Sequence, residues 1–77
     1  MGIPLYQMQT TQTGVIVHIN AGQELTRRMA ALGLRPGRQI EIIRKAPWQG
    51  PLQIRIGHTE LIIRRGEAAK IEVEPTS

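Results

Sequence analysis

The sequence predicts a mainly β protein, a small and partly open barrel of about five antiparallel strands with one α-helix between the first two. Several short segments alternate apolar with polar residues, which is the period of a strand with one buried face. A single segment instead repeats apolar residues at helical spacing. The 77 residues include no Phe and only Tyr6 and Trp48 as aromatic residues, so the thin core must be aliphatic. We treat residues 1–77 as one domain.

The first strand is predicted over residues 14–20, after a lead-in over residues 1–12. Val15, Val17 and Ile19 are spaced two apart, so they should face the core together. The side chains between them should then point outwards.

The helix is predicted to begin at Asn20, a good N-cap residue, and to end near Gly33. Leu25, Met29 and Leu32 have i, i+4, i+7 spacing and should form one buried stripe.

The stretch "AALGLRPGRQI" links this helix to the second strand. Gly33 suits the C′ position of the helix, and Pro36 with Gly37 suits the centre of a type II turn. The stretch lacks the Lys-Ser/Thr pair of a phosphate loop, and it leaves a helix where such a loop enters one. It is therefore a hinge.

Three antiparallel strands are predicted over residues 38–45, 52–56 and 59–64, and a last strand over 70–74 before a tail at 75–77. The loop "APWQGP" and a break at Gly57 separate the middle strands. The inward residues should be Ile40, Ile42, Leu52, Ile54, Ile56, Leu61, Ile63, Ile71 and Val73.

The chain carries ten Lys and Arg against six Glu, a net charge of +4. A basic surface can meet nucleic acid, anionic lipid or an acidic protein, although solubility alone would also explain the charge. The sequence shows no signal peptide and no apolar run of membrane-spanning length, so we expect a soluble, cytoplasmic protein.

Residue types exclude most catalytic chemistry. The sequence has no Cys and no Asp, and its single Ser is Ser77. Cysteine nucleophiles, thiolate metal sites and a Ser-His-Asp triad are therefore excluded. We predict that the protein is not an enzyme and needs no cofactor.

His58 and Glu60 form the one weak candidate for a metal site. They lie two apart on an expected strand, which would place their Cβ atoms about 7 Å apart on one face. A third ligand is not evident, and the alternative is a solvated His beside a solvated Glu.

Several large apolar residues fall on the outer face or in a loop: Ile16, Ile43, Trp48 and Ile62. They would form a docking patch for a partner, unless the N-terminal segment or the loops cover them. Trp48 is either a contact residue or a lid packed over the thin core.

An ordered set of residues resembles the FeoA family, small cytoplasmic proteins of bacterial ferrous-iron uptake. The similarity spans residues 3–74, and Ile62 departs from it because the family often has a small residue there. The matching residues are Gly14, Arg28, Leu32, Gly33, Leu34, Pro36, Gly37, Pro47, Gly50, Pro51, Gly57, Leu61, Ile63, Arg64, Ala68, Ile71 and Val73.

The resemblance implies an SH3-like barrel and a non-enzymatic adaptor that docks on the cytoplasmic side of the ferrous iron permease, a FeoB-type membrane GTPase. We expect the contact in a groove between the 46–51 loop, the helix and neighbouring strand edges, with Trp48, Arg27, Arg35 and Ile62 as contact residues. The rival interpretation is a small basic barrel that binds nucleic acid or another protein. Scattered arginines and two distant aromatic residues count against nucleic acid.

Overall fold

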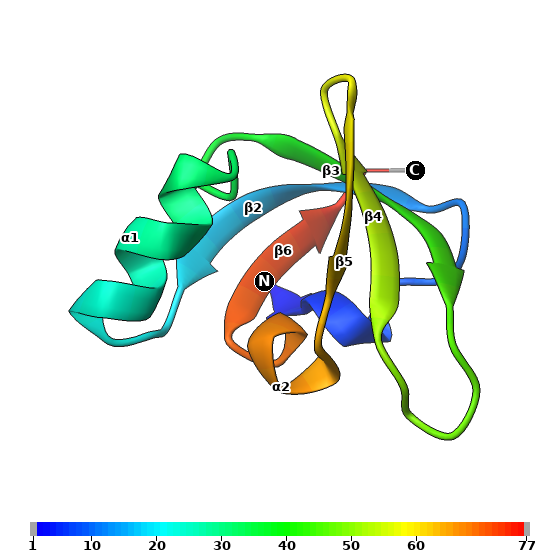
Figure 1. Cartoon of the computed structure of the whole chain (residues 1–77). Helices are drawn as coiled ribbons and strands as arrows, with labels where there is room; N and C mark the ends of the chain where they lie inside the picture. The colour runs from blue at the N-terminus through cyan, green and yellow to red at the C-terminus, as the bar shows by residue number, and fades with distance from the viewer. Residues whose placement is uncertain (1, 77) are drawn as a thin grey trace.

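The computed structural model describes residues 2–76 as one curled antiparallel sheet with two helices and a short 3₁₀ turn (Figure 1). The strands pair in the order β1-β6-β2-β3-β4-β5. The elements along the chain are β1 (Ile3–Pro4), η1 (Leu5–Gln7), β2 (Thr13–Ile19), α1 (Gln23–Ala31), β3 (Gln39–Lys45), β4 (Leu52–Ile56), β5 (Thr59–Ile63), α2 (Arg65–Ala68) and β6 (Ile71–Pro75). The predicted mainly β class and the helix between the first two predicted strands, here β2 and β3, are confirmed.

The predicted lead-in over residues 1–12 was partly wrong, because residues 3–8 belong to the fold. β1 pairs with β6, and Ile3 lies opposite Val73. The 3₁₀ turn that follows places Leu5 and Met8 in the core with no exposed surface. A two-residue strand containing Pro has no alternation to detect, so the count of about five strands missed this one.

The core face of β2 differs from the prediction. Ile16 is fully buried, whereas Val17 is 40% exposed. Ile16 lies opposite Val73 and His18 lies opposite Glu72, which leaves Val17 as the extra residue of a β-bulge. Because side chains alternate with a period of two, one extra residue moves the following side chains to the other face.

α1 begins later than predicted and buries less. Gly22 is its N-cap residue, and the Asn20 backbone N–H instead donates to the Lys70 carbonyl at 2.8 Å, extending the contact with β6. Of the predicted stripe, Met29 is buried, Leu25 is half-buried and Leu32 is 52% exposed.

The hinge after α1 has the predicted geometry. Gly33 has a φ of 96°, and the N–H groups of Gly33 and Leu34 donate to the carbonyls of Ala30 and Met29 at 3.0 and 2.9 Å. These two bonds are the Schellman motif, and Leu34 is buried as its apolar partner. Gly37 has a φ of 92° in the turn that follows, as a type II turn requires.

The core is aliphatic and lies inside the curled sheet. Of the inward residues predicted in the last four strands, all are buried except Leu61, which is half-buried. The predicted tail was partly wrong: Pro75 ends β6 and the Thr76 N–H donates to the Thr13 carbonyl at 3.0 Å, while Ser77 lies outside the described residues.

Candidate functional site

The loop 46–51 is a tight hairpin connection between β3 and β4. The Ala46 N–H donates to the Pro51 carbonyl at 3.0 Å, and the Gly50 N–H donates to the Pro47 carbonyl at 3.1 Å. Both central residues are left-handed, with φ of 61° at Trp48 and 57° at the next residue. This is the pattern of a type I′ turn, which normally carries Asn-Gly at its centre.

Trp48 stands at the tip of this turn and is 96% exposed. A lid over the core would lose most of its exposed surface, so the lid interpretation was wrong. Left-handed backbone is unfavourable for a bulky residue, so the tip holds a large aromatic side chain in water at some cost in stability.

A shallow hollow of about 90 Å³ lies beside the loop on the outer face of the sheet. Arg44, Ala46, Pro51, Gln53 and Ile62 line it. Ile62 is 72% exposed, whereas Ile16 is buried and Ile43 is half-buried, so half of the predicted outward apolar set is exposed. We call the loop 46–51 together with Arg44, Lys45, Ile62, Arg64 and Arg65 the Trp48 end.

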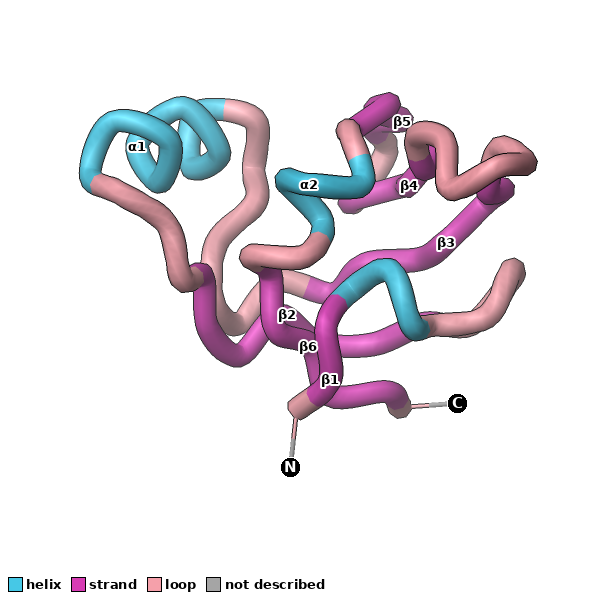
Figure 2. Tube along the Cα trace, turned by 90° about the horizontal axis from the view of Figure 1, so that it is seen from below, coloured by secondary structure: helices cyan, strands magenta, loops and turns pink. Residues whose placement is uncertain are grey.

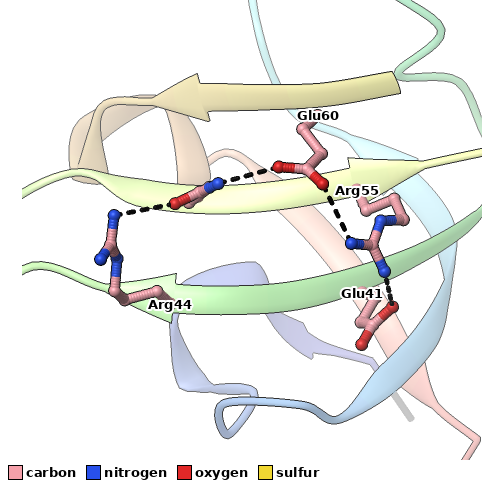
Figure 3. A network of polar contacts seen from close by, with 5 residues as sticks. Glu41, Arg44, Arg55 and Glu60 are labelled. Carbon is pink, nitrogen blue, oxygen red and sulfur yellow. Dashed lines mark hydrogen bonds and ion pairs between the residues drawn. The ribbon is translucent and has the colours of Figure 1, made fainter. Parts of the chain in front are cut away.

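A chain of polar contacts crosses the outer face next to this hollow (Figure 3). Arg44 donates to Gln53 at 3.1 Å, and Gln53 donates to Glu60 at 3.0 Å. Arg55 bridges Glu60 at 3.0 Å and Glu41 at 3.3 Å. The hydrogen bond from Arg55 lowers the pKa of Glu60, and the bond from Gln53 adds to this effect.

The arrangement of His58 and Glu60 does not match the predicted metal pair. His58 lies in the two-residue turn that follows β4, not on the strand beside Glu60. Both carboxylate oxygens of Glu60 already accept hydrogen bonds, one from Gln53 and one from Arg55. Within residues 2–76, no group of three or more His, Cys, Asp or Glu side chains could hold a metal ion.

The two predicted arginine contacts lie away from Trp48. Arg27 is exposed on α1, and the Arg35 Nε donates to the Ala30 carbonyl at 3.3 Å, where it caps the C-terminal end of that helix. α1 and the loop 46–51 stand at opposite ends of the molecule in both views (Figures 1 and 2). The predicted groove between them does not form, and the four proposed contact residues divide into two separate surfaces.

A second small hollow, of about 40 Å³, lies between α1 and the start of α2. We call it the α1 hollow. Its lining is mostly apolar, with one Arg and one Glu: Leu25, Arg28, Met29, Leu32, Leu34, Ile63 and Glu67. The sequence contained a signal for this hollow. The predicted apolar stripe has three residues, Leu25, Met29 and Leu32, but only Met29 is buried, so the other two leave apolar surface beside it.

A further hollow, of about 310 Å³, has a lining that is part polar and part apolar. Arg38 and Arg55 both line it, but Arg55 is paired with Glu41 and Glu60. Arg65 lies over the Tyr6 ring at 4.4 Å, which leaves that ring unavailable for base stacking. These contacts weaken the nucleic-acid interpretation.

The chain folds as a small SH3-like barrel that presents one protruding aromatic tip and one mostly apolar hollow. The model of the FeoA domain matches residues 3–75, so the chain belongs to the FeoA family. These are non-catalytic proteins of ferrous iron transport. No helix within residues 2–76 is long and apolar enough to cross a membrane.

Relatives agree with this assignment. A Porphyromonas gingivalis protein described as a fusion of Fe(2+) transport protein A and the Fe(2+) transporter FeoB is 33% identical over 70 residues. The match covers 91% of this chain but only 8% of that relative. A crystal structure of an iron uptake regulatory protein, FeoA, has 29% identity and a TM-score of 0.90, over 99% of this chain and 100% of that one.

A zinc-complexed FeoA from Stenotrophomonas maltophilia, described as a prokaryotic SH3 domain protein, supports the fold. It is 24% identical, with a TM-score of 0.79, over 96% of this chain and 89% of that one. The predicted SH3-like fold is thereby confirmed.

Proposed function

We propose that this protein is an accessory factor of ferrous iron uptake that docks on the cytoplasmic GTP-binding part of a FeoB-type permease. The observation that carries the proposal is the fusion relative, in which a segment similar to this chain is joined to a FeoB transporter. Fusion keeps two partners at high effective concentration, which is useful when they act together.

The α1 hollow is our candidate for the protein contact. It is concave, so a side chain of the partner can enter it and lose its water. Leu32 is 52% exposed at its rim, and Arg27 is exposed on the same helix with no ion pair among the described residues. An apolar anchor flanked by acidic residues on the permease would match this surface.

Binding of the isolated GTP-binding part to the full chain tests the proposal, measured by calorimetry. Leu32→Glu should weaken binding at least tenfold, because it places a carboxylate in the hollow and loses the apolar contact. Arg27→Glu should weaken binding less than Leu32→Glu does. Its effect should be larger at low salt than at high salt, because salt screens the lost charge contact.

Val17→Glu is the matched control, since it adds the same charge at an exposed apolar site outside the hollow. Failure of the unchanged chain to bind would reject the docking function. Equal binding by the Leu32 variant and the unchanged chain would reject this surface alone.

A further inference from the structure

The Trp48 end has the features of a surface that meets a lipid bilayer. The loop 46–51 at its tip lies away from α1, although Arg64 and Arg65 stand in the chain between Ile63 and Glu67 of the α1 hollow (Figure 1). Its tip is convex, because Trp48 projects from a two-residue turn with 96% of its surface exposed. A protruding tip suits a flat and yielding layer of headgroups, whereas a concave hollow suits the side chain of a folded partner. Tryptophan prefers the membrane–water interface, where its ring is apolar and its N–H reaches polar groups.

The loop that carries Trp48 has no charged side chain. Its sequence, "APWQGP", contains only apolar residues, glycine and one Gln. Ile62, 72% exposed, adds apolar surface beside the loop across the shallow hollow. Burial of an ionised group is the largest energetic penalty for entering a membrane interface. Insertion of this tip into the headgroups would bury none.

Cationic residues flank the base of the uncharged loop. Arg44 and Lys45 precede the loop at the end of β3, and Arg64 and Arg65 follow the end of β5, which pairs with β4 beside the loop. Glu67 lies in α2 beside them, and Glu60 is linked to Arg44 through Gln53 and paired with Arg55. The other four glutamates lie in α1, on β6 or in the ion pair with Arg55: Glu24, Glu41, Glu72 and Glu74.

From these three observations we infer that the Trp48 end binds the surface of an anionic lipid bilayer, with Trp48 entering the headgroup layer and the flanking cations meeting acidic lipids. The inference goes beyond the docking proposal and depends on different residues. Each Lys or Arg near such a surface strengthens binding about fivefold, so Arg44 and Arg64, the exposed cations among these four, carry much of the expected affinity.

The turn itself supplies a matched pair of variants. Trp48→Asn places the residue that type I′ turns prefer at this position and removes the ring. Gln49→Gly completes the preferred turn from the other side and keeps the ring. Both variants should fold at least as well as the unchanged chain, so loss of lipid binding in the first alone reports on the indole ring.

The experiment uses the full chain and vesicles of phosphatidylcholine with or without phosphatidylglycerol. Because Trp48 is the single Trp of the chain, its fluorescence reports directly on this end. We expect its emission to shift to shorter wavelength with the anionic vesicles and not with the phosphatidylcholine vesicles. Added salt should reverse the shift. In co-sedimentation, Gln49→Gly should bind like the unchanged chain, Trp48→Asn should lose at least fivefold, and the double variant Arg44→Gln with Arg64→Gln should lose about twenty-five-fold.

Three results would overturn the inference. The first is no binding to anionic vesicles at low salt. The second is binding without a change in Trp48 emission, which would mean that another face adsorbs through net charge. The third is a shift with the isolated GTP-binding part of the permease and none with vesicles, which would make Trp48 an anchor for a protein. The first two results leave the docking test unaffected, since the vesicles contain no permease, whereas the third would move the docking contact from the α1 hollow to Trp48.

Discussion

At the centre of the 46–51 turn, two residues hold a backbone conformation that lowers stability, and one of them exposes a large aromatic side chain. Trp48 and Gln49 both hold positive φ, a conformation that costs non-glycine residues about 1–2 kcal/mol each when it is fully left-handed. The chain keeps them although Asn-Gly would satisfy the same turn. Such a choice is typical of a position retained for contact rather than for folding.

We therefore predict that Gln49→Gly raises the free energy of unfolding by about 0.5–1 kcal/mol, and that Trp48→Asn does so to a similar extent. Urea unfolding followed by circular dichroism measures both variants without relying on the indole. Destabilisation by Gln49→Gly would show that the left-handed turn is not under strain.

Gly50, which closes the same turn, should behave in the opposite way. A Cβ atom built there would lie 2.9 Å from the Ala46 Cβ and 3.0 Å from the Pro47 carbonyl oxygen. Gly50→Ala should lower the free energy of unfolding by about 1–3 kcal/mol, because the crowded atoms are mainly backbone and short side chain. Gly66→Ala, at a site with nothing within 4 Å, is the control in the same unfolding experiment.

Glu60 gives a prediction for acid conditions. The hydrogen bond from Arg55 lowers its pKa in the folded protein below the ordinary value near 4.5. A carboxyl group with a lowered folded pKa stabilises the fold above its unfolded pKa, and that stability is lost as the pH falls through the folded pKa. Glu60→Gln should therefore flatten the decline in the free energy of unfolding below about pH 4.5, measured by urea unfolding across pH.

The effect of Glu60→Gln should be small, because the group is exposed and water screens it. Glu24→Gln, at an exposed carboxylate outside the network, is the control for removing one negative charge. An equal flattening by both variants would contradict a specific role for the Arg55 contact.

Among the elements, β2 shows where the alternation of residues in the sequence fails to predict the buried face of a strand. The alternation from Val15 to Ile19 predicts an unbroken strand, but the bulge at Val17 buries Ile16 and exposes Val17, while Ile19 is buried as predicted. A bulge leaves no mark in a run where apolar residues occupy both faces, so the sequence offered no means to place it. β4 and β6, whose polar and apolar residues alternate cleanly, were predicted with the correct faces.

The bulge predicts opposite results for neighbouring residues. Ile16→Ala should lower the free energy of unfolding by about 2–4 kcal/mol, since it opens a cavity at a fully buried site. Val17→Ala, at the exposed bulge position, should change it by less than about 0.5 kcal/mol. Thermal and urea unfolding of the two variants measure this difference. A larger loss of stability for Val17→Ala than for Ile16→Ala would show that the strand runs without the bulge.

For the molecule as a whole, the arrangement of the two surfaces could not be predicted from the chain. Local signals identified the hinge at Gly33, the hairpin loop around Trp48 and the outward position of Ile62. They placed Trp48 and Arg27 in one groove, because residue spacing says little about which loops meet across a curled sheet. In fact α1, which carries Arg27, and the loop 46–51, which carries Trp48, lie at opposite ends of the molecule (Figure 1).

Opposite placement predicts that the two proposed contacts act independently. Sites that are more than about 7–10 Å apart and share no partner usually contribute additively to the free energy. With the complete permease in an anionic bilayer, Trp48→Asn and Leu32→Glu should each lower the affinity, and the combined variant should lose the product of the two factors. Linkage raises the overall affinity through effective concentration, but each single variant should lose the same factor as it loses on its isolated partner. If Trp48→Asn and the unchanged chain bind such membranes with equal affinity, the permease is the sole partner. If the combined variant loses no more affinity than one single variant, both residues belong to one interface.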